Sequence, residues 1–178
     1  MHSLRRQTGM RPQDVAVLLD LTTRDHQPWQ QRTVAAAVHL SPSEVGAALA
    51  RSVLASLYEP ATRTVNRHAL VELLTHGLRY VFPATLGPVV RGVTTAFSAP
   101  VLAAHIQSRE ALVWPYPHGT VRGAGAAVCR GRRGRFGPPS PLRSLALTDA
   151  LRLGRVRERE LAPRELTCRL LEARPVTT

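Results

Sequence analysis

The sequence predicts a mainly α-helical protein of the α+β class. Apolar residues recur at helical spacing over much of residues 12–81 and again after residue 142, and cap signals stand before several of these segments. Only residues 58–65 and the Pro- and Gly-interrupted residues 82–121 favour extended structure and turns. With 178 residues, 44% of them apolar, the chain can form one domain with an accessory region or two small domains.

The first helix is expected to begin at Pro12, because proline fits the first helical position and Asp14 then lies near the positive end of the helix dipole. After the break at residues 26–28, Trp29 is expected to pack as a hydrophobic plug between this helix and the next. One side of the first helix is apolar and is formed by Val15, Leu18, Leu19 and Thr22.

Residues 31–57 contain two helical patterns joined by a short polar turn, a spacing typical of a helix-turn-helix. Thr33 is expected to cap the first helix, whose buried stripe is formed by Val34, Ala37 and Val38. The second helix is expected to begin at Pro42, with Ser41 as N-cap and Glu44 as the partner in a capping box. His39 falls in the turn, where histidine tolerates a positive φ better than most residues do.

The second of these helices has two faces. The apolar face is formed by Val45, Ala48, Leu49, Val53 and Leu57, and the opposite, outward face by Ser43, Gly46, Ala47, Ala50 and Arg51. In a helix-turn-helix the outward face enters the major groove of DNA. Ser43 discriminates poorly between bases, so Arg51 is expected to make the two-pronged contact to guanine, while Ala47 and Ala50 touch thymine methyl groups.

Residues 58–65 are expected to form a small wing, because Tyr58 and Val65 favour strands and residues 60–63 can turn. Arg63 at the tip is a candidate contact to phosphate or to the minor groove, and a solvated loop arginine is the alternative. Asn66 is expected to cap a following helix over residues 67–82. Its apolar stripe is formed by Leu70, Leu73, Leu74, Leu78 and Val81.

The segment VAAAVHLSPSEVGAAL resembles the helix-turn-helix of bacterial winged-helix transcriptional regulators, the MarR-like ones among them, and the resemblance covers roughly residues 12–66. A small residue stands at Ala35 and aliphatic residues at Leu40 and Val45, as in that family, whereas His39 replaces a common glycine. The resemblance implies a winged helix-turn-helix that binds double-stranded DNA as a homodimer through the helix after the wing. Two helices joined by a short turn also occur in many all-helical cores.

The residues expected to contact DNA are Arg32, Ser41, Ser43, Gly46, Ala47, Ala50, Arg51, Arg63 and Thr64. The winged helix-turn-helix domain is expected over residues 10–81. The nine residues before Met10 carry no periodicity, and they are either a basic arm or the product of an upstream mis-start.

Residues 82–121 are expected to be an accessory segment of extended stretches and turns, with helices only at 99–106 and 109–112. Residues 114–117 are expected to form an aromatic-proline turn that closes a core, and a peptide-binding surface is the alternative. The segment YVFPATLGPVVRGVTTAFSAP is also similar to a segment of uncharacterised bacterial helix-turn-helix proteins, to which no activity is attached.

Residues 122–141 are rich in Gly, Arg and Pro and cannot bury enough apolar area to offset their ordering entropy, so a flexible linker is expected. A nonspecific nucleic-acid tether and a local reading-frame error are the alternatives. Residues 142–178 regain helical spacing, and Pro163 is expected to separate two short helices there. Glu160 with Arg164 and Glu165 with Arg169 are spaced for ion pairs.

The net charge of +12 says little about DNA binding, because its distribution does not follow the helix-turn-helix. All 24 basic residues are arginine, which is consistent with a GC-rich genome, and six of them lie within residues 122–143, where there is no acid. Residues 31–57 hold only Arg32, Arg51 and Glu44 as charges, a net of +1. Affinity for DNA is therefore expected to be modest and to depend on dimerisation.

No enzyme, cofactor or metal site is expected. The chain lacks a phosphate-binding glycine loop and the common hydrolase and metalloprotease motifs, and Cys129 and Cys168 are not paired at a metal-ligand spacing. His68 and His76 have no third ligand at helical spacing. Because no apolar run approaches the ~20 residues that span a bilayer and no export signal is evident, a cytoplasmic protein without a membrane partner is expected.

The sequence therefore predicts a sequence-specific transcriptional regulator that reads the major groove with residues 42–57. The alternative is an antitoxin-like or adaptor module with a degenerate helix-turn-helix, in which the C-terminal region binds a protein partner.

Overall fold

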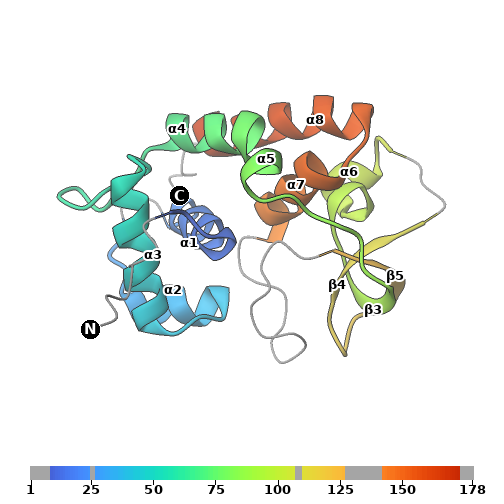
Figure 1. Cartoon of the computed structure of the whole chain (residues 1–178), viewed down its shortest axis with the longest axis horizontal. Helices are drawn as coiled ribbons and strands as arrows, with labels where there is room; N and C mark the ends of the chain where they lie inside the picture. Colours follow the sequence, from blue (N-terminus) through green and yellow to red (C-terminus); the bar gives the residue numbers. More distant parts are fainter. Residues whose placement is uncertain (1–8, 25–26, 107–109, 127–141, 173–178) are drawn as a thin grey trace, which may run out of the picture.

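The computed structural model describes residues 9–24, 27–106, 110–126 and 142–172. Helices make up most of this part of the chain, with a small sheet beside them, so the α+β class is confirmed (Figure 1). Helices α1 (Pro12–Thr22), α2 (Gln31–Val38) and α3 (Pro42–Leu54) pack together at one end of the molecule. A short antiparallel hairpin follows, formed by β1 (Tyr58–Glu59) and β2 (Thr64–Val65), where the sequence predicts a turn between two strands.

Helix α1 begins at Pro12, as predicted, and its apolar residues lie at the centre of the helical end of the molecule. The Asp14 side chain accepts a hydrogen bond from the Arg11 backbone N–H at 2.8 Å, which satisfies one of the free amide groups at the helix start. Every residue of α1 from Asp14 to Thr22 is buried. The helix is therefore packed on all sides, and not on one stripe alone.

The N-cap of α3 is the predicted residue, whereas the N-cap of α2 is not. Ser41 caps α3: its hydroxyl accepts from the Glu44 N–H at 3.3 Å, and the Glu44 carboxylate accepts from the Ser41 N–H at 2.8 Å. Helix α2, however, begins two residues before the predicted cap Thr33, whose hydroxyl accepts from the Gln30 N–H at 3.2 Å. The N-cap is therefore Gln30, and Thr33, at the third helical position, is its reciprocal partner in a capping box. His39 ends α2 with the expected positive φ of 58°.

The helix predicted after the hairpin forms in three parts: α4 (Arg67–Glu72), a π-helical turn η1 (Leu73–Gly77) and α5 (Leu78–Val81). Asn66 is its cap, since the side-chain oxygen accepts from the Ala69 N–H at 3.1 Å. The wider π turn keeps residues four positions apart in line, and Leu70, Leu74 and Leu78 are all buried. Val81, the last residue of the predicted apolar stripe, is 54% exposed, so the prediction that it packs with the others is wrong.

The second half of the chain contains a closed sheet of three strands, β3 (Val89–Thr94), β4 (Leu112–Pro115) and β5 (Val121–Gly125). Strand β3 is antiparallel to both others, and β4 runs parallel to β5. So small a barrel requires close approach of backbones: a Cβ built on Gly92 would lie 1.9 Å from the Trp114 carbonyl oxygen. The turn η2 (Ala96–Ser98) and the short helix α6 (Pro100–Ala103) follow β3.

This sheet and the short helix beside it overturn four predictions. Of the helix predicted over 109–112, residues 110–112 are not helical, because Leu112 begins β4, and residue 109 lies outside the described residues. Trp114 and Pro115 lie in that strand instead of a turn. The helix predicted over 99–106 is reduced to α6 and a following turn. Residues 122–125 of the predicted linker form β5, since pairing with β3 provides the hydrogen bonds that their own side chains could not. Residues 127–141 of that linker lie outside the described residues.

The C-terminal helices are α7 (Leu142–Leu153), α8 (Val156–Thr167) and a final π-helical turn η3 (Cys168–Glu172). Pro163 lies inside α8, so the predicted break is wrong. Residues of α8 are buried before and after this proline, at Glu158, Ala162 and Leu166, and packing against α4, α6 and α7 offsets the lost hydrogen bond. Of the two predicted ion pairs, that between Glu165 and Arg169 is formed at 2.6 Å, whereas within the described residues Glu160 and Arg164 form none.

One cluster of buried apolar side chains extends from α1 to η3. The predicted divisions at residues 81 and 142 therefore separate segments that share a core. Over the ranges that the structure describes, every helix is too short or too polar to cross a bilayer.

Candidate nucleic-acid interface

The outward side of α3 is formed by Ser43, Ala47 and Ala50, which are all exposed; we call these three residues the α3 face. Gly46 is half-buried between this face and α2, where a Cβ in its place would lie 3.6 Å from the Gln31 side chain. These positions agree with the outward face predicted from helical periodicity. The opposite side of the helix holds Val45, Ala48 and Leu49 in the core. Of the two remaining predicted core positions, Val53 is wrong because it is 38% exposed, whereas Leu57 is buried although the helix ends at Leu54.

Arg51 does not lie on the α3 face, so its predicted outward position is wrong. Only 8% of the residue is exposed, and its guanidinium forms a two-pronged ion pair with Asp14 of α1. Nε donates to Oδ2 at 2.7 Å and Nη2 donates to Oδ1 at 2.6 Å. The hydrogen bond to this carboxylate raises the pKa of Arg51 above its already high ordinary value.

Arg51 lies inward, and not on the α3 face, because of the Asp14 carboxylate. The Asp14 side chain is fully buried, and a buried charge without a partner is costly, so the Arg51 side chain turns toward α1. Arg51 stands at the border between the two faces of α3, where its apolar stem can follow the helix surface inward. Asp14 thereby joins the start of α1 to the last turn of α3.

Ser41 is exposed, but its hydroxyl serves the helix cap. Besides accepting from the Glu44 N–H, it donates to Glu44 Oε2 at 2.7 Å and lies 3.1 Å from the Ser43 hydroxyl. Its first role is thus to start α3, and Ser43 is the hydroxyl of this turn that lies on the α3 face.

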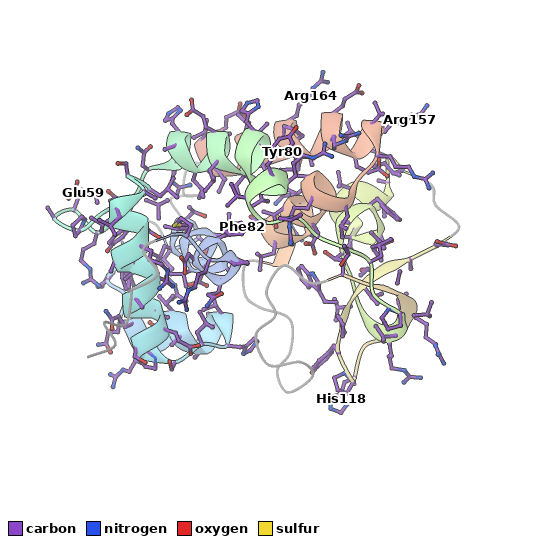
Figure 2. All side chains as sticks on the ribbon, viewed as in Figure 1. Glu59, Tyr80, Phe82, His118, Arg157 and Arg164 are labelled. Atoms are coloured by element: carbon purple, nitrogen blue, oxygen red, sulfur yellow. The ribbon has the colours of Figure 1, made fainter. Side chains whose placement is uncertain are left out.

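Arg63 sits at the bend of the hairpin with φ of 56° and folds back toward the segment before α2. Its guanidinium carbon lies 4.2 Å from the centre of the Trp29 ring, and Nη2 donates to the Trp29 carbonyl at 2.8 Å. Trp29 packs against the core as predicted, but its stacking on Arg63 was not foreseen. The Thr64 hydroxyl lies 2.7 Å from the Thr62 hydroxyl. Figure 2 shows the hairpin, with Glu59 labelled, projecting beside α3.

Arg32 is exposed in the first turn of α2. With Arg51 neutralised by Asp14, the exposed charged side chains of residues 31–57 are Arg32 and Glu44. The α3 face therefore carries less positive charge than the sequence predicts, and few phosphates could be neutralised by one copy of the chain.

One signal in the sequence pointed to the buried pair. Asp14 and Asp20 interrupt an otherwise apolar helix, and acidic residues are almost never fully buried unless they are paired. Asp20 is also buried and pairs with Arg24 at 2.6 Å, but one of its oxygens has no partner. Burial raises the pKa of Asp20 against the opposing effect of Arg24.

Within the described residues there is no group of three or more His, Cys, Asp or Glu side chains that could hold a metal ion. Comparison of the chain with known protein families, curated proteins and solved structures finds no match. The functional conclusion accordingly depends on the geometry of α2, α3 and the hairpin.

Proposed function

We propose that the chain is a sequence-specific DNA-binding transcriptional regulator of the winged helix-turn-helix kind, with α3 in the major groove and the β1–β2 hairpin as the wing. The observation that carries the proposal is the α3 face: a capped helix presents Ser43, Ala47 and Ala50 to solvent, next to a hairpin and at helix-turn-helix spacing. The left-handed His39 and the Ser41 cap support it, because they fix the turn between α2 and α3.

Because Arg51 is buried, base reading falls to Ser43 and to apolar contacts of Ala47 and Ala50 with thymine methyl groups. Arg32 would contact phosphate, and Arg63 could do so after leaving Trp29. A homodimer would double these contacts and place two half-sites about 34 to 36 Å apart, which is roughly one turn of DNA.

The test is selection from a randomised duplex library, followed by affinity measurements on the selected sequence. Ala47→Glu should abolish binding, because it places a carboxylate in the groove, whereas Ala103→Glu, an exposed alanine of α6, should leave binding unchanged. Failure to enrich any sequence, or equal loss in both variants, would contradict the proposal.

A protein partner on the same helix is the second candidate function, and the exposed apolar end of α3 favours it. Leu54 is 70% exposed and Val53 38%, and the face beside them is small and nearly uncharged. An antitoxin-like or adaptor role would use this surface. Leu54→Asp should then abolish capture of the partner, and binding should depend little on salt, whereas affinity for DNA falls steeply as salt rises.

A further inference from the structure

A cleft of about 290 Å³ lies on the side of the molecule where α5 meets α7 and α8. One wall comes from the π turn η1 and α5, and the other from α8. Leu151 of α7, which is 4% exposed, supplies an apolar surface within the cleft. Tyr80 is 75% exposed and stands on α5 beside α8 (Figure 2).

The charge of this cleft is one-sided. Arg79, Arg159 and His76 line it, and no Asp or Glu does. Arg79 lies over the Tyr80 ring at 5.4 Å, and Arg159 donates only to a backbone carbonyl, at 3.3 Å. In the part of the chain that the structure describes, neither arginine forms an ion pair. Two exposed arginines therefore line one cleft whose lining holds no carboxylate.

The helices of both walls are irregular at the cleft. Thr75 and His76 lie in the π turn, a feature that is frequent at functional sites. Pro163 lines the cleft from inside α8, and because proline has no N–H it cannot donate to the Arg159 carbonyl. The Thr75 hydroxyl is buried and has no hydrogen-bond partner. The Arg159 carbonyl thus lacks its usual helical donor and the Thr75 hydroxyl lacks a partner, and both belong to residues that line the cleft beside the two arginines without ion pairs.

We propose that this cleft binds a small phosphate monoester that carries one apolar ring. A phosphate monoester has a charge of about −1.5 to −2 at neutral pH, which Arg79 and Arg159 together balance, whereas a carboxylate would leave one guanidinium unneutralised. The volume lies at the lower end of ligand pockets, which begin at roughly 300 Å³, and so fits a single ring better than a dinucleotide. The ring would lie against Tyr80 and Leu151.

This inference is independent of the proposed DNA binding, because it uses α5, α7 and α8 instead of α3 and the hairpin. Isothermal titration calorimetry of the full chain with phenyl phosphate is the direct test. Saturable one-to-one binding is expected, and Arg79→Gln and Arg159→Gln should each weaken it about tenfold, since each removes charge-assisted hydrogen bonds. Benzoate and inorganic phosphate should bind more weakly than phenyl phosphate, because benzoate carries a single negative charge and inorganic phosphate lacks the ring.

The matched control is Arg164→Gln, which removes an exposed arginine of the same helix that points away from the body of the protein (Figure 2). It should bind phenyl phosphate as the wild type does, and this separates the cleft from general attraction to a basic protein. Thr75→Val should raise the melting temperature of the free protein, because it removes a buried hydroxyl without a partner. Absence of saturable binding in the millimolar range, or equal binding by the wild type and both cleft arginine variants, would overturn the proposal.

Discussion

Asp14 shows how one buried carboxylate decides the role of a distant arginine. Its oxygens accept from the Arg51 guanidinium and from the Arg11 backbone N–H, and its side chain is fully buried. Without Arg51, the Asp14 carboxylate would be a charge without a counter-charge in a site closed to water. The contribution of Arg51 is therefore expected in the stability of the fold and not in base preference.

We predict that Arg51→Met lowers the free energy of unfolding by about 3 to 5 kcal/mol, as removal of one partner of a buried pair does. Urea denaturation measures it. The double variant Asp14→Asn, Arg51→Met should recover part of the loss, and Arg32→Met, which removes an exposed arginine, should change stability by less than about 0.5 kcal/mol. A loss no larger for Arg51→Met than for Arg32→Met would contradict the structural role.

Asp149 of α7 is the second residue whose surroundings decide its chemistry. The fully buried carboxylate accepts from Trp114 Nε1 at 2.6 Å and from the Thr95 hydroxyl at 2.9 Å, and it pairs with Arg152 at 3.3 Å. Burial raises the pKa of Asp149 to about 6, and the three partners oppose this without cancelling it.

Stability should consequently fall as pH rises from about 4 to about 6, because in this window the unfolded chain has released the Asp149 proton and the folded protein still holds it. The shift corresponds to about 3 kcal/mol. Asp149→Asn should lack this slope, so denaturation curves of both proteins across the window provide the measurement. Parallel pH profiles would show that Asp149 ionises normally.

Among the elements, the three-stranded barrel is most sensitive to a single added methyl group. A Cβ at Gly92 would lie 1.9 Å from the Trp114 carbonyl oxygen and 2.7 Å from its carbonyl carbon, and both are backbone atoms that cannot turn aside. Strands β3 and β4 would have to separate where Gly92 is paired with Pro115.

Gly92→Ala is therefore predicted to cost about 3 kcal/mol or more, the upper end for overpacking. Thermal or urea unfolding measures the loss. Gly9→Ala is the control, because nothing lies within 4 Å of its added Cβ. If the two variants proved equally stable, the barrel would not close as described.

At the scale of the whole molecule, Arg67 joins segments from the two ends of the chain. Nη2 donates to the Thr22 carbonyl at the end of α1 at 2.7 Å, and Nη1 donates to the Leu170 carbonyl in η3 at 2.8 Å. These bonds lie over the continuous core that extends from α1 to η3, so the described parts of the chain should unfold together.

Arg67→Met should lower the free energy of unfolding by about 3 kcal/mol, since it removes at least two hydrogen bonds from a charged donor. Amide hydrogen exchange should quicken in both α1 and η3, although they are far apart in sequence. Faster exchange in only one of them would show that Arg67 does not join the two segments.

The sequence by itself determined the features that depend on neighbouring residues. The starts at Pro12, Ser41 and Asn66, the left-handed His39 and the outward positions of Ser43, Ala47 and Ala50 all follow from contacts within a few residues or from helical periodicity. Such interactions are nearly the same in any protein. Seven of the nine residues expected to contact DNA are therefore exposed, whereas Gly46 is half-buried and Arg51 is buried.

Only the tertiary structure decided the positions whose partners are distant in sequence. Arg51 is buried by a carboxylate 37 residues away, and residues 122–125 become a strand because β3 supplies their partners. Pro163 stays inside α8 because buried residues on both sides of it pack against other helices. In each case the free energy of burial or pairing exceeds the local preference of the segment, and that free energy exists only once the remote element is in place.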